Sequence, residues 1–276
     1  MIEKNSVFKK WSITAILGVF GLTMIFPIAW MISASFKYEA DVFKVPIEWI
    51  PSNINTGNYL FAISEYPFTQ WYTNTAFVTA LTVLFVLLFS SLSGYAFAKL
   101  NFTGKNVIFG LFIATLMIPN QVRLIPQFLI FKEMNLIDNP LAVALPWMFN
   151  GFSIFLMRQF YASIPDELIE SARIDGSNEY RTFFQIVLPL AKSQIAALFI
   201  LAFTWGWNEY MGPLIYINDI NKQVLSVGIA SFRGQYSANF AVQMAGATMA
   251  LIPIIVVYIC AQKQFIQGIA LTGTKG

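Results

Sequence analysis

The densest group of ionisable residues lies in the stretch SIPDELIESARIDGSNEYR, residues 163–181. Carboxylates in pairs can act as general acid and base or ligate a metal ion. This stretch supplies five of them: Asp166, Glu167, Glu170, Asp175 and Glu179. However, the chain has no histidine and one cysteine, Cys260, which removes Ser-His-Asp triads and His/Cys zinc sets. No GxxxxGK[ST] phosphate loop occurs either. We therefore predict no catalytic residues, no metal site and no cofactor on this chain, and we interpret the stretch as a binding element.

The polar stretch interrupts an otherwise apolar chain. Apolar residues make up 57% of the sequence and charged residues 11%, whereas soluble domains carry about 25% charged residues. The mean hydropathy is +0.62. Apolar runs long enough to span a bilayer, which requires about 20 residues, predict six helices: 11–36, 73–98, 106–131, 139–160, 190–216 and 238–262. We expect an all-α membrane protein with one transmembrane domain over 1–276 and a polar loop at 163–189.

The distribution of basic residues predicts the orientation. With the N-terminus inside, eleven of the 17 Lys and Arg residues lie on the cytoplasmic side, which favours both termini in the cytoplasm. This places 163–189 inside and 37–72 and 217–233 outside. The first apolar run exceeds a signal-peptide core, so we expect it to remain as a helix. The net charge of +3 reflects this asymmetry and does not indicate a nucleic-acid partner.

Turn and cap residues divide the polar loop into two short helices. Pro165 suits the first turn of a helix, and Gly176 can end that helix in the left-handed conformation. Ser177 is then expected to cap the second helix. Glu170 and Arg173, three residues apart, are placed to pair. The sequence therefore predicts two amphipathic helices that meet at a glycine elbow.

The apolar side of the first helix raises the question of its partner. Ile164, Leu168 and Ala172 recur every four residues, and we expect no partner for them within a cytoplasmic loop of this size. They could lie on the membrane surface or enter a groove on another protein. The loop is net acidic, whereas interfacial helices usually carry Lys and Arg, so the protein partner is favoured.

The loop resembles the EAA signature of permease subunits in binding-protein-dependent ABC importers. In that signature a Glu-Ala-Ala triplet is followed at fixed spacing by a glycine and by Ile-x-Leu-Pro. This sequence keeps every spacing, with these residues at the seven positions: Glu170, Ser171, Ala172, Gly176, Ile186, Leu188 and Pro189. Ser171 departs from alanine but is nearly as small. The resemblance implies that these residues, together with Asp175, form the coupling helix that docks on a separate ATPase subunit.

Further segments are similar to the carbohydrate branch of these permeases, in particular to the second permease subunit of the maltose and multiple-sugar type. They are MIPNQVRLIPQF (117–128), WNEYMGPLIYI (207–217), LSVGIASFRGQY (225–236) and the tail QKQFIQGIALTGTKG (262–276). The resemblance implies a type I importer fold in the cytoplasmic (inner) membrane of a bacterium or archaeon. It also implies a homologous second permease, two ATPase subunits that hold ATP and Mg²⁺, and an extracytoplasmic sugar-binding protein. The loop 217–233 would face the binding protein, and the tail would touch the ATPases.

Two charges interrupt the predicted spans, Arg123 in the third and Glu209 in the fifth. Charges within spans are functional candidates, although the rise along each helix places both near the outer surface, where an interfacial anchor is the alternative. We predict an outer-gate or binding-protein contact, with the two side chains paired. Pro119 and Pro126 indicate either a broken helix that lines a cavity or a simple kink.

Three further polar side chains, Asn150, Asn208 and Tyr210, could face the path of the sugar. Ordinary interhelical hydrogen bonds are the other interpretation of these residues. The sequence is also compatible with a permease of the same architecture that transports a non-sugar solute. An ATP-independent secondary transporter and an intramembrane enzyme are disfavoured, since the spans hold no convincing ionisable residues near mid-bilayer and no nucleophile constellation.

Overall fold

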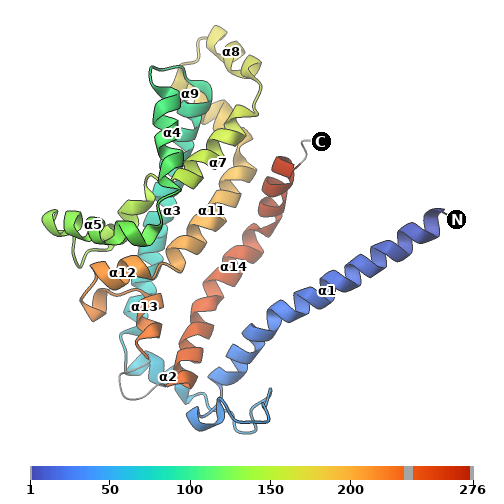
Figure 1. Cartoon of the computed structure of the whole chain (residues 1–276), viewed down its shortest axis with the longest axis vertical. Helices are drawn as coiled ribbons and strands as arrows, with labels where there is room; N and C mark the ends of the chain where they lie inside the picture. The colour runs from blue at the N-terminus through green and yellow to red at the C-terminus, as the bar shows by residue number, and fades with distance from the viewer. Residues whose placement is uncertain (1, 233–238, 274–276) are drawn as a thin grey trace. The chain divides into compact units, whose positions relative to one another are not determined.

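The structure, a computed structural model, describes residues 2–232 and 239–273, and the side-chain environments of 9–232 and 239–263. All its regular elements in these ranges are helical, which confirms the predicted all-α fold (Figure 1). The principal α-helices are α1 (Ile2–Ser35), α2 (Gly57–Ser64), α3 (Phe68–Lys99), α4 (Lys105–Thr115), α5 (Asn120–Glu133), α6 (Pro140–Ala144), α7 (Gly151–Ala162), α8 (Asp166–Ile174), α9 (Glu179–Thr182), α10 (Leu188–Leu190), α11 (Lys192–Trp207), α12 (Met211–Tyr216), α13 (Leu225–Ala230) and α14 (Phe240–Gly273).

By length and composition, three to six segments of the described chain can cross a membrane. Three are unbroken: Lys9–Ser35, Phe68–Lys99 and Phe240–Lys263. The others are bent pairs, with angles of 104° between α4 and α5, 40° between Pro140–Trp147 and α7, and 80° between Glu179–Leu190 and Lys192–Tyr216. The ranges 106–131, 139–160 and 190–216, predicted as single helices, are therefore interrupted.

Local sequence explains two of these interruptions. Pro119 precedes α5 with extended ψ, and a proline disfavours the helical conformation of the residue before it. Asn150 caps α7, and its side-chain oxygen accepts a hydrogen bond from the Ser153 N–H at 2.9 Å. Pro126, in contrast, lies inside α5 without ending it.

Contacts divide the chain, predicted as one domain, into two compact units. Unit 1 comprises 1–68 and 229–252, and unit 2 comprises 69–228 and 253–276. In unit 1 the buried Asn58 donates to the carbonyls of Ser35 and Lys37, at 2.9 and 2.8 Å, which fixes α2 at the end of α1.

Unit 2 is built around α3, α7 and α11, which pack closely because glycines face neighbouring helices (Figure 1). A Cβ on Gly94 of α3 would lie 2.7 Å from the Cβ of Met157, and one on Gly206 of α11 would lie 3.0 Å from the Cα of Thr79. Small residues that bring backbones together are typical of helix contacts in membranes.

Two predictions fall partly on residues that the structure does not describe. Arg233, at the end of the outer loop, lies outside the described residues, as do residues 234–236 of the segment 225–236. Residues 274–276 of the tail lie outside them too. The binding-protein contact of the loop and the ATPase contact of the tail remain predictions.

Candidate functional site

The coupling segment, which we define as residues 163–189, has the predicted glycine elbow. Gly176 has φ +78°, and apart from its chain neighbours no described residue has an atom within 4 Å of where its Cβ would be. The N–H of Ser177 bonds to the carbonyl of Ala172 at 2.9 Å and that of Gly176 to the carbonyl of Arg173 at 3.1 Å, which is a Schellman closure of α8. Because Ser177 belongs to this closure, its predicted capping role was wrong: Asn178 caps α9, accepting the N–H of Arg181 at 2.9 Å.

Two residues of α3 hold the coupling segment at both of its helix starts. Lys99 Nζ lies 2.6 Å from Asp166 Oδ1 and donates to the Ile164 carbonyl at 2.5 Å. One turn earlier, Tyr95 donates its hydroxyl hydrogen to Glu179 Oε2 at 2.8 Å. Hydrogen bonding from Lys99, with its positive charge, lowers the pKa of Asp166. The two starts are thus attached to one face of α3.

The predicted pairing of Glu170 with Arg173 was wrong. Arg173 Nε instead contacts Glu179 Oε1 at 2.8 Å. The elbow at Gly176 turns the start of α9 back toward α8, so that a carboxylate six residues along the chain comes within reach. Glu179 therefore joins α8, α9 and α3 through its two oxygens.

The apolar side predicted for the first helix is partnered within unit 2 at two of its three residues, Ile164 and Ala172, contrary to the prediction. Ile164 and Ile169 are buried in a core with Tyr95, and Ala172 is also buried. Leu168, the third residue of that spacing, is 44% exposed, and the most exposed apolar side chains of the segment are Ile174 at 86% and Tyr180 at 77%. The four-residue spacing did not single out Ile174 and Tyr180, and these two residues offer a partner the most exposed apolar side chains of the segment.

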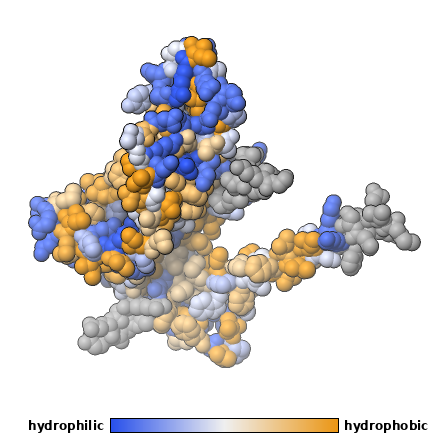
Figure 2. All heavy atoms as spheres, turned by 45° about the horizontal axis from the view of Figure 1, so that its top comes forward, coloured by the Kyte–Doolittle hydropathy of each residue, from blue (hydrophilic) through white to orange (hydrophobic). Residues whose placement is uncertain are grey.

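The signature residues thus divide between two surfaces. Glu170, Ser171, Asp175, Gly176 and Pro189 are exposed, Ile186 and Leu188 are half-buried, and Ala172 is buried. Figure 2 shows mainly hydrophilic surface over the end of unit 2 that carries α8 and α9, and mainly hydrophobic surface along the helices below it. The signature therefore combines residues that attach the segment to unit 2 with residues that face outward.

A second site, which we call the broken-helix cavity, lies where helices of unit 2 are interrupted. It has a volume of about 450 Å³. Its walls come from the break between α4 and α5, the start of α7, and the break between α11 and α12. Non-helical backbone at membrane depth is tolerated where it is buried in protein or lines a water-filled cavity. Of the predicted path residues, Arg123, Asn150 and Glu209 line it, whereas Asn208 and Tyr210 are not among its lining residues.

The predicted ion pair between Arg123 and Glu209 is not among the ion pairs of the described residues. Arg123 donates to the side-chain oxygen of Asn120, and Glu209 Oε1 accepts the N–H of Gly212 at 3.1 Å. The prediction relied on rise along straight helices, which does not hold across a bend of 104°. The two charges nevertheless share one cavity, each bonded within its own segment.

The remaining predicted path residues bond locally. Asn150 caps α7, and Asn208 donates to the Thr204 carbonyl at 2.8 Å, in the same helix. Tyr210 precedes α12 and is 36% exposed. None of these contacts is the interhelical hydrogen bond that the sequence also allowed.

Three cavity residues were missed by sequence reasoning. Tyr216 donates its hydroxyl hydrogen to Gln127 Oε1 at 2.9 Å, which joins α12 to α5 across 89 positions. Trp147 is stacked on Trp205, with ring centroids 5.4 Å apart and planes at 14°. Local sequence patterns do not predict these two pairs, because the two residues of each pair are distant in sequence.

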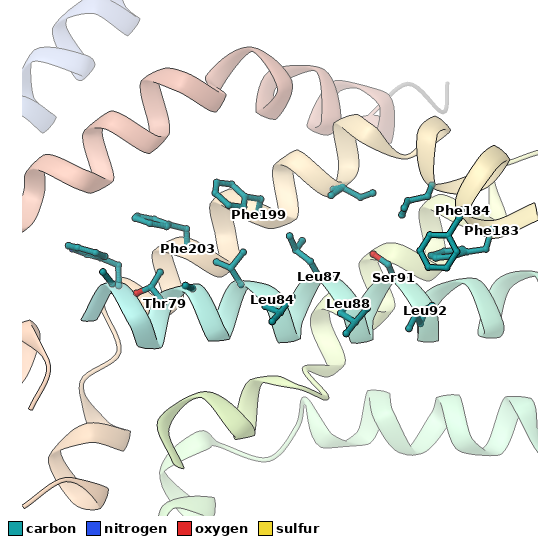
Figure 3. Close-up of a pocket in the computed structure, with 16 residues that line it drawn as sticks. Thr79, Leu84, Leu87, Leu88, Ser91, Leu92, Phe183, Phe184, Phe199 and Phe203 are labelled. Atoms are coloured by element: carbon teal, nitrogen blue, oxygen red, sulfur yellow. The ribbon is translucent and has the colours of Figure 1, made fainter. Parts of the chain in front are cut away.

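Unit 2 also carries an apolar groove of about 680 Å³ between α3, α11 and the π-helical turn Phe183–Val187. Figure 3 shows leucines of α3 facing phenylalanines of α11 and of the turn, with Thr79 and Ser91 as the polar side chains of the lining. This groove suits hydrocarbon and gives a hydroxylated solute few partners. In the described residues no group of three or more His, Cys, Asp or Glu could hold a metal ion.

Comparisons with known proteins identify the family. Residues 87–270 match the model of the binding-protein-dependent transport system inner membrane component. The arabinooligosaccharides transport system permease protein AraQ of Halalkalibacterium halodurans is 32% identical over 279 residues, with 100% of both chains covered. The sn-glycerol-3-phosphate transport system permease protein UgpE of Pectobacterium atrosepticum is 33% identical, with 98% of both chains covered. A solved chain from a bacterial ABC transporter involved in the import of the acidic polysaccharide alginate superposes with a TM-score of 0.79 at 28% identity, covering 91% of this chain and 94% of that one. This chain therefore belongs to the family of binding-protein-dependent inner membrane permease components of ABC transporters.

Proposed function

We propose that the chain is one of two permease subunits of an ATP-driven importer that takes up a carbohydrate, of oligosaccharide size, delivered by an extracytoplasmic binding protein. A homologous permease would complete the path, and two separate ATPase subunits would hold ATP and Mg²⁺. The chain itself would catalyse no reaction and bind no cofactor. It would lie in the cytoplasmic membrane of a bacterium or archaeon, in contact with lipid and with both termini in the cytoplasm.

The coupling segment is the observation that carries this proposal. Its outward side combines acidic residues with Ile174 and Tyr180, and its inward side is attached to α3 by Lys99 and Tyr95. A short apolar and acidic helix fits a groove on a partner protein better than an anionic membrane surface. Movement of such a partner would be passed to α3 through the two attachments.

The substrate class is supported by the relatives. Two of the relatives described above transport arabinooligosaccharides and alginate, and both share the full length of this chain or nearly so. The sn-glycerol-3-phosphate permease, at 33% identity, supports a second candidate, a phosphorylated polyol. We favour the carbohydrate because the broken-helix cavity holds amide and aromatic side chains beside a carboxylate.

Docking on an ATPase can be tested by co-purification of the tagged chain with its ATPase subunits. We expect Ile174→Glu to abolish co-purification, since the substitution places a charge at the centre of the apolar contact. Ile54→Glu is the matched control: Ile54 is 68% exposed but lies in the segment predicted outside. Equal retention by both variants would contradict the docking proposal.

Transport can be tested in proteoliposomes that contain the assembled importer. We expect uptake of a labelled oligosaccharide only with ATP inside and the binding protein outside. Uptake of sn-glycerol 3-phosphate in place of sugars would favour the second candidate. Uptake without ATP would contradict both candidates.

A further inference from the structure

Resting on the proposed function, we infer that the broken-helix cavity is a binding subsite on this chain for a neutral, polyhydroxylated ligand such as a sugar unit. Gln127, Glu209 and Trp147 are its recognition residues. The subsite lies wholly within unit 2, so this chain contributes substrate contacts of its own.

The cavity is held open by contacts between distant elements. Gly151 at the start of α7 packs against α4 so closely that a Cβ would lie 2.8 Å from the Phe112 carbonyl oxygen. The bond from Tyr216 to Gln127 ties α12 to α5. The Ser226 hydroxyl donates to the Glu209 carbonyl at 2.5 Å, which fixes the break between α11 and α12. The polar groups of the cavity are therefore positioned before a ligand arrives, which lowers the entropic cost of binding.

The polar groups of the cavity match hydroxyl chemistry. The Tyr216 bond occupies the oxygen of Gln127, and among the described residues no other hydrogen bond involves that side chain, which leaves its two N–H donors for a ligand. The Glu209 carboxyl accepts the Gly212 N–H at Oε1, interacts with the Tyr210 N–H as well, and offers its remaining acceptor positions. Buried Arg123 Nε has no partner among the described residues. A sugar hydroxyl both donates and accepts, so it can satisfy all three.

Charge argues for a neutral ligand. Arg123 and Glu209 are the charged side chains of the lining, one of each sign, so the lining offers an anion no net positive charge. A carboxylate or phosphate ligand would meet the Glu209 carboxylate in the same cavity, and like charges at an interface are strongly unfavourable. The Trp147 ring, held in its stack with Trp205, adds a flat apolar wall of the kind that suits the face of a sugar ring.

The test measures binding to the assembled importer in nanodiscs without binding protein or ATP. Labelled arabinotriose and maltotriose serve as neutral probes, and alginate trisaccharide and sn-glycerol 3-phosphate as anionic ones. We expect a neutral probe to bind more tightly than both anions. Gln127→Ala should raise its Kd about tenfold, as expected for a lost hydrogen bond in a buried site. Tyr216→Phe, which keeps the ring, should raise it less.

Two further variants make the inference falsifiable. Glu209→Gln should improve binding of alginate trisaccharide relative to the neutral probe, because it removes the repelling charge. Gln70→Ala, an exposed glutamine at the start of α3, should change nothing. An unchanged Kd in correctly folded Gln127→Ala, tighter binding of an anion by the wild type, or no binding of either neutral probe would overturn the inference. ATP-dependent sugar uptake would still stand in those cases, so the proposed function is tested separately.

Discussion

The coupling segment and the broken-helix cavity use their polar residues in opposite ways. In the coupling segment the carboxylates of Asp166 and Glu179 each meet a cation or a hydroxyl from another helix. In the cavity Arg123 and Glu209 bond within their own segments, and Arg123 Nε has no hydrogen-bond partner in the part of the chain that the structure describes. The first arrangement makes a rigid attachment that can pass on force, whereas the second leaves hydrogen-bonding capacity for a ligand.

Substitution of Gly176 at the glycine elbow should separate the functions of the two regions most strongly. We expect Gly176→Val to abolish ATP-dependent uptake, because φ +78° costs a side chain about 1–2 kcal/mol and a β-branched residue more. Relaxation of the elbow would move α9 and release Glu179 from Tyr95. Binding of a neutral sugar in the cavity should be unchanged.

Gly104 provides the matched control for this prediction. It has φ +82°, and the nearest atom to its Cβ position is 3.8 Å away, so valine there introduces the same backbone strain outside the coupling segment. Gly104→Val should retain most uptake. Equal loss in both variants would show that backbone strain, and not the coupling elbow, limits transport.

Removal of the attachment to α3 should have the next largest effect. Lys99 is 4% exposed and bonds both Asp166 and the Ile164 carbonyl, so Lys99→Met removes two contacts with one change. We expect uptake to fall about tenfold, while the ATPases still co-purify and hydrolyse ATP. Lys105→Met, which removes a bond to the Leu100 carbonyl, is the control. If the ATPases no longer co-purified with the Lys99→Met variant, Lys99 would be required for docking of the ATPases.

Close packing at the glycines predicts a purely structural effect on unit 2. Gly94→Ala would place a Cβ 2.7 Å from that of Met157, and overpacking of this kind costs about 1–3 kcal/mol. We expect a lower melting temperature of the purified chain. Gly110→Ala, where no described residue outside the helix's own backbone comes within 4 Å of the Cβ position, should leave the melting temperature unchanged or raise it. A lower melting temperature in both variants would contradict the packing explanation, because Gly→Ala in a helix is otherwise neutral or favourable.

The two regions also differ in how far the sequence predicted them. The coupling segment depends on local rules, so Gly176 and the two-helix arrangement were predictable from cap residues and spacing. The error in predicting the cap of α9 also had a local cause. Asn178, and not Ser177, is the cap, because Ser177 already takes part in the closure of α8. The exposure of Ile174 could not be predicted, since it depends on which face of α8 meets α3.

The cavity depends on tertiary contacts, and the sequence predicted only its components. Pro119 indicated a break, and Arg123, Asn150 and Glu209 stood out as polar residues in apolar surroundings. The bond between Gln127 and Tyr216 and the stack of Trp147 on Trp205 required the bend of 104° and the fold of unit 2. Straight-helix geometry therefore predicted a charge pair that the bend prevents.

The smallest expected effect concerns the loop beside α6. Low pH should weaken the contact between Asp138 in this loop and the loop that contains Asn218 and Asp219. Asp138 Oδ1 accepts the N–H groups of Asp219 and Asn218, at 2.9 and 2.5 Å, and these bonds lower the pKa of Asp138 below its ordinary 3.8. A lowered folded pKa means that the stabilisation is complete above the ordinary value and is lost as the pH falls through the folded pKa. We expect Asp138→Asn to lower the melting temperature slightly at pH 7.

The difference between Asp138→Asn and the wild type should shrink as the pH falls below about 4, because the wild-type carboxyl is then protonated as well. Asp175→Asn is the control, since its exposed carboxylate accepts no hydrogen bond among the described residues. Thermal unfolding in detergent between pH 7 and pH 3 measures both. A difference that stayed constant with pH would mean that the charge of Asp138 does not contribute to the contact, whereas no difference at pH 7 would mean that the neutral amide accepts the N–H groups of Asn218 and Asp219 equally well.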